Sequence, residues 1–148
     1  MNINIICVGK IKEKYFTAAI EEYSKRLSRF SRLNIIEVAD EKIPDNASEK
    51  ECEIEKNKAG AKIISKLSRD AYVIAMCIEG REISSEGLAE KIAATSMTAS
   101  NITFIIGGSL GLSDEVKQMA NHKMSFGKNN PAAPAYARGA FGAGIQGV

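Results

Sequence analysis

A glycine loop is the segment whose residue types best suit ligand chemistry. The stretch FIIGGSLGLS places Gly107 and Gly108 directly after an apolar run. Two adjacent glycines let backbone amides approach a ligand with no Cβ atoms in the way. The dinucleotide fingerprint G-x-G-x-x-G fails because residue 109 is Ser109, and no G-x-x-x-x-G-K-[ST] phosphate loop is present. On pattern alone, a ligand loop and a tight strand-to-helix turn are equally good interpretations.

Side chains suited to nucleophilic, acid–base or metal chemistry are scarce. His122 is the only histidine, so few side chains are available for a catalytic triad or a histidine-based zinc site. Its neighbours are polar, and we expect it at the surface. The acidic pairs Glu21–Glu22 and Asp40–Glu41 are sequence neighbours, and nothing in the pattern brings them together for acid–base work.

Composition favours one soluble domain in a reducing compartment. The chain has 148 residues, of which 45% are hydrophobic and 26% charged. Cys7, Cys52 and Cys77 are odd in number and far apart, which favours the cytoplasm over a disulfide framework. No apolar run approaches the roughly 20 residues of a membrane helix. The first strand-like run, NINIICVG, has no basic leader, so no signal peptide is expected.

Charge is distributed unevenly along the chain. Residues 9–33 carry seven basic and three acidic side chains, and residues 37–56 carry eight acidic and three basic ones. A basic segment attracts phosphates electrostatically. Charge alone nevertheless favours a solvated helix surface.

Apolar runs alternate with helical patterns along residues 1–128. Strands are predicted for INIICV, LNIIEV, AYVIAMCI, ITFII and KMSF. A helix is predicted where Phe16, Ile20, Tyr23, Leu27 and Phe30 recur at helical spacing. Three further helices follow the candidate caps Ser48, Ser84 or Ser85, and Ser113, and EGRE is predicted to form a turn. This order predicts an α/β fold, a parallel sheet with helices on both faces.

Several ordered stretches together resemble one family. They are VGKIKEKYFTAAIEEYSKRL, IIEVADEKIP, AYVIAMCIEGREISSEGLAEKI, FIIGGSLGLSDEV and KMSFGK. In sequence and spacing they are similar to the small SPOUT-class methyltransferases, which modify a pseudouridine of 23S ribosomal RNA at N3. The resemblance covers residues 1–128, nearly all of the patterned chain.

The resemblance implies a cofactor, a partner and a set of site residues. It implies a SPOUT-like fold with a C-terminal trefoil knot, S-adenosylmethionine as methyl donor, and a homodimer that acts on 23S ribosomal RNA in the ribosome. The cofactor-binding positions that it implies are Met76, Gly107, Gly108, Phe126, Gly127 and Lys128. Methyl transfer from a sulfonium needs no metal and no protein nucleophile, which suits this residue inventory. The resemblance also favours the interpretation of the basic segment as an RNA-binding surface. Its residues Lys10, Lys12 and Lys14 would face phosphates.

The tail over residues 129–148 departs from the family. It is rich in Ala, Gly and Pro, whereas the family continues with a segment like M-T-F-P-H-Q-L-M-R and an apolar helix. Ala133–Arg138 can be encoded as GCA CCA GCT TAT GCG CGT, and omitting the first base gives H-Q-L-M-R. The same shift converts all of residues 129–148 into the family pattern. The sequence therefore predicts a SPOUT-like domain over 1–128, a frameshifted tail over 129–148 without a regular helix, and an incomplete knot.

Three functional hypotheses follow. The first is a ribosomal RNA methyltransferase that uses S-adenosylmethionine and is impaired by the frameshift. The second is a non-catalytic RNA- or nucleotide-binding remnant with the same core. The third, an unrelated dinucleotide enzyme, is disfavoured by the failed fingerprint.

Overall fold

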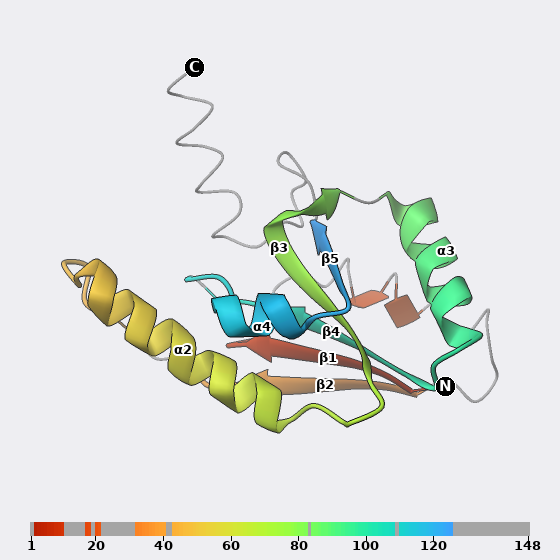
Figure 1. The fold of residues 1–148 in the computed structure, drawn as a ribbon, viewed down its shortest axis with the longest axis horizontal. Coiled ribbons are helices and arrows are strands. Elements are labelled where there is room, and N and C mark those ends of the chain that lie inside the picture. Colours follow the sequence, from red (N-terminus) through yellow and green to blue (C-terminus); the bar gives the residue numbers. More distant parts are fainter. Residues whose placement is uncertain are drawn as a thin grey trace, which may run out of the picture.

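The computed structural model describes residues 2–10, 17–18, 20–21, 32–40, 43–82, 84–108 and 110–125. The predicted tail, the knot, and the positions Lys12, Lys14, Phe126, Gly127 and Lys128 lie outside these residues. The elements are β1 (Asn2–Val8), β2 (Arg32–Val38), α2 (Glu49–Ser65), β3 (Tyr72–Glu82), α3 (Ser85–Ser96), β4 (Asn101–Ile106), α4 (Asp114–Met119) and β5 (His122–Ser125) (Figure 1). Of the helix expected over residues 16–30, the described residues 17, 18, 20 and 21 are helical.

The strands form one sheet in the order β2-β1-β4-β3-β5, and every neighbouring pair is parallel. In the register, Ile5 of β1 lies opposite Ile35 of β2 on one side and Phe104 of β4 on the other. Phe104 in turn lies opposite Ile74 of β3. The predicted parallel α/β sheet is confirmed.

Both faces of the sheet are covered, which explains why its central strands are continuous apolar runs. On one face α3 contributes Ile92 to a cluster that also holds Ile20 and Phe104. On the other face α2 contributes Ile63 and α4 contributes Val116. Figure 1 shows α2 and α4 together on one side of the sheet and α3 on the other. The predicted placement of helices on both faces is confirmed.

Serine caps set where the helices begin. The Ser48 hydroxyl accepts a hydrogen bond from the Glu51 amide at 3.1 Å, and that of Ser84 accepts one from the Gly87 amide at 3.0 Å. At α4, the Ser113 hydroxyl accepts a hydrogen bond from the backbone amide of Val116 at 3.3 Å. Each bond satisfies an amide that has no partner within its helix. Of the two serines predicted to cap α3, Ser84 is the cap.

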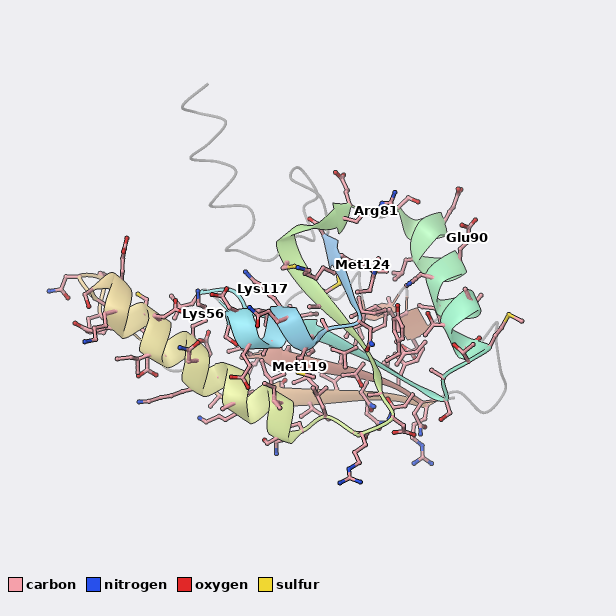
Figure 2. The ribbon with its side chains drawn as sticks, viewed as in Figure 1. Lys56, Arg81, Glu90, Lys117, Met119 and Met124 are labelled. Atoms are coloured by element: carbon pink, nitrogen blue, oxygen red, sulfur yellow. The ribbon has the colours of Figure 1, made fainter. Side chains whose placement is uncertain are left out.

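The predicted turn over residues 79–82 is wrong, because β3 continues to Glu82. The pairing of β3 with β5 shifts register between Met76 and Arg81, so the extra residues are absorbed without ending the strand. A Cβ atom on Gly80 would lie 2.6 Å from the Met124 backbone, so only glycine allows this close approach. Figure 2 shows Met124 on β5 beside β3. The glycine that indicated a turn instead permits strand contact.

Gly60 lets α2 pack closely against the start of α4. A Cβ atom there would overlap the Ser113 hydroxyl and lie 3.1 Å from the Ser113 Cβ. Alanine improves intrinsic helix propensity by about 1 kcal/mol, but overpacking costs about 1–3 kcal/mol. We therefore expect Gly60→Ala to lower the free energy of unfolding by about 1 kcal/mol, measured by urea titration.

A double-mutant cycle isolates the steric cause of that loss. Ser113→Ala removes the cap and also the hydroxyl that the new methyl group would strike. Gly60→Ala should therefore cost less in the Ser113→Ala background than in the original chain. Equal costs in both backgrounds would show that the contact with Ser113 does not explain why residue 60 is glycine.

Candidate functional site: the carboxyl ends of the strands

The glycine loop begins where β4 ends, at the carboxyl edge of the sheet. Gly107 is buried and follows Ile106 directly. A Cβ atom on Gly107 would lie 2.7 Å from the carbonyl carbon of Gly111, so the loop folds back on its own backbone. Gly108 and Gly111 form an isolated bridge, and Gly111 adopts a positive φ of 80°. The loop is therefore a compact backbone surface that no larger residue could replace unchanged.

Beside this loop, the end of β4 pairs with the interior of β3, which continues to Glu82. Met76 of β3 lies opposite Ile106 of β4 and also opposite Met124 of β5. The three residues thus form a row across β4, β3 and β5, and Gly107 follows directly after one end of it. The Met76 side chain is 1% exposed and packs in the core on the α3 face. In open α/β sheets, ligands bind just beyond such strand ends.

A cavity of about 320 Å³ lies beside the same loop, at the ends of β1, β2 and β4. Its walls include Val8, Asp40, Lys56, Lys58, Lys62 and Gly108. The lysines come from α2, whereas Asp40 follows β2. The α2 wall therefore carries three lysines and also the carboxylate of Glu55, and Asp40 adds a second carboxylate after β2.

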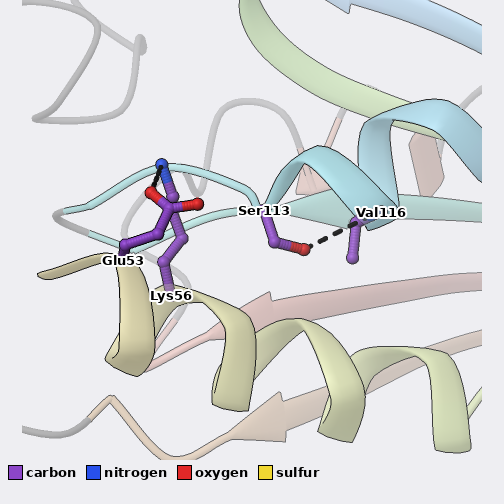
Figure 3. A network of polar contacts seen from close by, with 4 residues as sticks. All are labelled: Glu53, Lys56, Ser113 and Val116. Carbon is purple, nitrogen blue, oxygen red and sulfur yellow. Dashed lines mark hydrogen bonds and ion pairs between the residues drawn. The ribbon is translucent and has the colours of Figure 1, made fainter. Parts of the chain in front are cut away.

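Two of the three lysines already have a carboxylate partner. The Lys56 ammonium lies 3.2 Å from a Glu53 oxygen, and the Lys58 ammonium lies 3.3 Å from a Glu55 oxygen. Figure 3 shows Lys56 extending from α2 toward the loop that joins β4 to α4. Within the described part of the chain, Lys62 has no ion-pair partner. Lys62 is thus the cation most available to an incoming anion.

Comparison with known proteins identifies the family. A family model described as predicted SPOUT methyltransferase matches residues 1–130. The chain belongs to the SPOUT methyltransferase family. It is 57% identical over 129 residues to the ribosomal RNA large subunit methyltransferase H of Clostridium novyi (strain NT), 55% to that of Clostridium botulinum (strain Kyoto / Type A2) and 52% to that of Clostridium kluyveri (strain NBRC 12016). Each match covers 86% of this chain and 81% of the relative. The resemblance predicted from the sequence is confirmed.

Within this SPOUT chain, the predicted cofactor positions that are described gather at one edge of the sheet. Gly107 and Gly108 follow the end of β4, and Met76 lies inside β3, opposite Ile106, the last residue of β4. Phe126, Gly127 and Lys128 are outside the described residues, although Ser125 ends β5 next to β3. These roles remain predictions. Of the predicted RNA-binding residues, Lys10 is exposed just after β1, while Lys12 and Lys14 lie outside the described residues.

Sequence reasoning missed the second wall of the cavity. The pair Asp40–Glu41 was expected on a helix or loop surface without a role in acid–base work, yet a Cβ atom on Gly108 would lie 3.1 Å from the Asp40 carboxylate. The same carboxyl group lies close to Gly9, which adopts a positive φ of 83°. The available signal was its position directly after β2, because the carboxyl ends of parallel strands share one edge of a sheet. The α2 lysines gave no signal, because their spacing is that of an ordinary solvated helix.

No metal site emerges from the described residues, and none of their helices is long and apolar enough to cross a membrane. His122 is only half-buried, although its backbone is paired with Ile74. Burial, and then the positive charges of Lys91 and Arg81, lower the pKa of His122 below its ordinary 6.5. The imidazole is therefore biased toward its neutral form.

The His122 titration gives a direct check of this environment. As the only histidine, it should give one NMR titration with a midpoint below 6.5. Lys91→Gln should raise that midpoint part of the way, because burial remains, whereas Lys58→Gln on α2 should leave it unchanged. Because the folded chain binds the proton more weakly than the unfolded chain, this group stabilises the fold above pH 6.5. That contribution should be lost as the pH falls through the folded-state pKa. A midpoint at or above 6.5 would contradict the placement.

Proposed function

We propose that this chain is an S-adenosylmethionine-dependent methyltransferase by descent, acting on N3 of a pseudouridine in 23S ribosomal RNA. The observation that carries the proposal is 57% identity over 129 residues to a relative named ribosomal RNA large subunit methyltransferase H. The match to the family model spans residues 1–130, which include all five strands of the sheet and the glycine loop.

The edge of the sheet suits a methyl donor. Met76, Gly107 and Gly108, with Phe126, Gly127 and Lys128 after β5, would hold S-adenosylmethionine against the strand ends. When bound, the cofactor's sulfonium supplies the methyl group. The protein's own task is to fix donor and acceptor in line and to exclude water. Glycines at 107, 108 and 111 leave the loop backbone open to a ligand, which serves that task.

RNA would be attracted by the basic segment after β1. Lys10, Lys12 and Lys14 are proposed to contact phosphates without reading the base sequence, so their contribution should weaken with salt. The substrate would be 23S ribosomal RNA within the ribosome, which places the protein in the cytoplasm. A homodimer is proposed because family members build the site from two chains.

The tail over residues 129–148 is proposed to be the product of a frameshift that impairs cofactor binding. The permitted codons support this, because omitting one base from codons that can encode the tail gives the family pattern. Alanine, glycine and proline bury little apolar area, so burial offsets little of the conformational entropy lost when such a segment is ordered. The second candidate function, a non-catalytic RNA- or nucleotide-binding remnant, follows from the same loss.

A calorimetric titration with S-adenosylmethionine separates these functions. A weakened enzyme should still bind the cofactor, though less tightly than the same chain with its reading frame restored. A binding remnant should show no cofactor heat in the 148-residue chain but should show it when the frame is restored, whereas a chain that does not descend from a methyltransferase should show none in either form. The latter result would overturn the proposed activity.

A further inference from the structure

Asn121 joins the start of β5 to β3 through two hydrogen bonds. Its backbone amide donates to the Val73 carbonyl oxygen at 2.8 Å. Its side-chain oxygen Oδ1 accepts a hydrogen bond from the Val73 amide, also at 2.8 Å. Val73 is buried, so its amide needs a protein partner. The Asn121 side chain thus takes the place of a backbone carbonyl, one residue before the regular pairing of β5 begins at His122.

The apolar pattern of β5 fits two registers on β3. Met124 lies opposite Met76, and its side chain is buried in the core on the α3 face. Residues two apart in a strand share a face, so Phe126 has the same parity as Met124. A slip of two residues would place Phe126 opposite Met76 and keep an apolar side chain inward. Burial alone therefore does not select the present register.

The other contacts of β5 leave the same choice open. A Cβ atom on Gly80 would lie 2.6 Å from the Met124 backbone, but every residue has a backbone, so this contact does not select which residue lies there. The connection from α4 would gain two residues in the slipped register, at little entropic cost.

The partner of the Val73 amide does distinguish the two registers. After a slip of two residues, Lys123 would lie where Asn121 now lies. A lysine ammonium donates hydrogen bonds and accepts none, so the Val73 amide would lose its side-chain acceptor. The present register keeps that acceptor because residue 121 is asparagine.

We propose that Asn121 is a positioning residue whose side chain fixes the register of β5 on β3 and so the place of the segment after β5. A slip of two residues would shift that segment by about 6.6 Å along the strand. The proposed function assigns residues 126–128 of this segment to the cofactor, and the inference rests on that function only for what the segment binds. The register itself is measurable without cofactor.

The first test compares Asn121→Ala with Asn121→Asp in the 148-residue chain by NMR. Aspartate keeps an oxygen acceptor, whereas alanine leaves the Val73 amide without one. The exchange rate of the Val73 amide, divided by that of the Phe104 amide in the sheet centre, separates local opening from global unfolding. Asn121→Ala should raise this ratio by about fivefold, as expected for one lost hydrogen bond, and Asn121→Asp should keep it within about twofold.

Cross-strand nuclear Overhauser effects report the register directly. In the present chain Met76 should show them to Met124 alone. In Asn121→Ala it should show them to both Met124 and Phe126, because neither register then provides a side-chain acceptor for Val73. A single set in Asn121→Ala, or two sets in Asn121→Asp, would overturn the proposal. So would an unchanged exchange ratio in Asn121→Ala.

The affinity for S-adenosylmethionine is the second readout, measured by calorimetry in the present and frame-restored chains. Asn121→Ala should weaken it by about threefold, since only the fraction of chains in the present register binds. Asn121→Asp should restore it. Asn57→Ala, which removes an exposed amide on α2, and Ile92→Val, which lowers stability on α3, should leave both affinity and register unchanged.

The two readouts keep this inference apart from the proposed function. If no chain binds the cofactor while Asn121→Ala still shows two registers, the methyltransferase proposal falls and the role of Asn121 in β5 stands. Unchanged affinity in Asn121→Ala despite two registers would show that the segment after β5 does not hold the cofactor. An equal loss of affinity in Ile92→Val would show that Asn121 acts only through stability.

Discussion

Restoring the reading frame after Lys128 should raise the affinity for S-adenosylmethionine by about 100-fold, measured by calorimetry. The reason is that half of the proposed cofactor contacts, Phe126, Gly127 and Lys128, directly precede the altered segment. A loss of about 2.7 kcal/mol in binding free energy corresponds to that factor. The restored apolar helix should also shift the chain toward a dimer in size-exclusion chromatography.

A chain truncated after Lys128 is the matched control. If the tail merely fails to replace the family segment, truncation should leave the cofactor affinity within about threefold of the 148-residue chain. Tight binding by the truncated chain would show that the tail obstructs the site instead. Equal affinity in the frame-restored and present chains would contradict the frameshift account altogether.

Gly107→Ala, placed in the frame-restored chain, should reduce methyl transfer by about 100-fold. Its new methyl group would lie 2.7 Å from backbone carbon and 2.9 Å from backbone oxygen of Gly111, and neither atom can move without the loop. A displacement of about 1 Å between donor and acceptor is enough for such a loss. The measurement is the rate of methyl transfer from labelled cofactor to ribosomal RNA.

A control variant must show whether the lower transfer rate of Gly107→Ala comes from a less stable fold or from a displaced glycine loop. Ile92→Val on α3 removes one buried methyl group and should cost about 1 kcal/mol of stability, comparable to the overpacking at Gly107. It lies on α3, away from the loop, and should keep the transfer rate within about threefold. Similar rates for the two variants would show that the loop geometry at residue 107 has no special role.

The sheet could be predicted because its strands carry strong local signals. The runs around Ile5 and Phe104 are mostly apolar, since helices cover both faces, and serine caps mark the starts of α2, α3 and α4. The residues 79–82 were predicted wrongly because a glycine that permits strand contact and one that forms a turn look the same in sequence. Gly80 serves the backbone of β5, which is more than 40 residues away in the chain.

The candidate site could be predicted only in part. The loop at Gly107 is a local feature of sequence, and the family resemblance supplied the positions around it. Asp40 and Lys62 meet at one cavity because β2, β4 and α2 converge in space, and no local pattern encodes that convergence. Their charges also look like those of ordinary solvated residues. Asp40 and Lys62 are candidate site residues because the fold brings their elements together, not because of their residue types.

The most direct test of the account is methyl transfer to pseudouridine in ribosomes that lack the modification. Labelled S-adenosylmethionine is supplied to the 148-residue chain and to the frame-restored chain, and N3-methylpseudouridine in 23S ribosomal RNA is quantified by mass spectrometry. The account predicts robust product with the frame-restored chain and little or none with the present chain. Equal product from the two chains, or none from either, would contradict it.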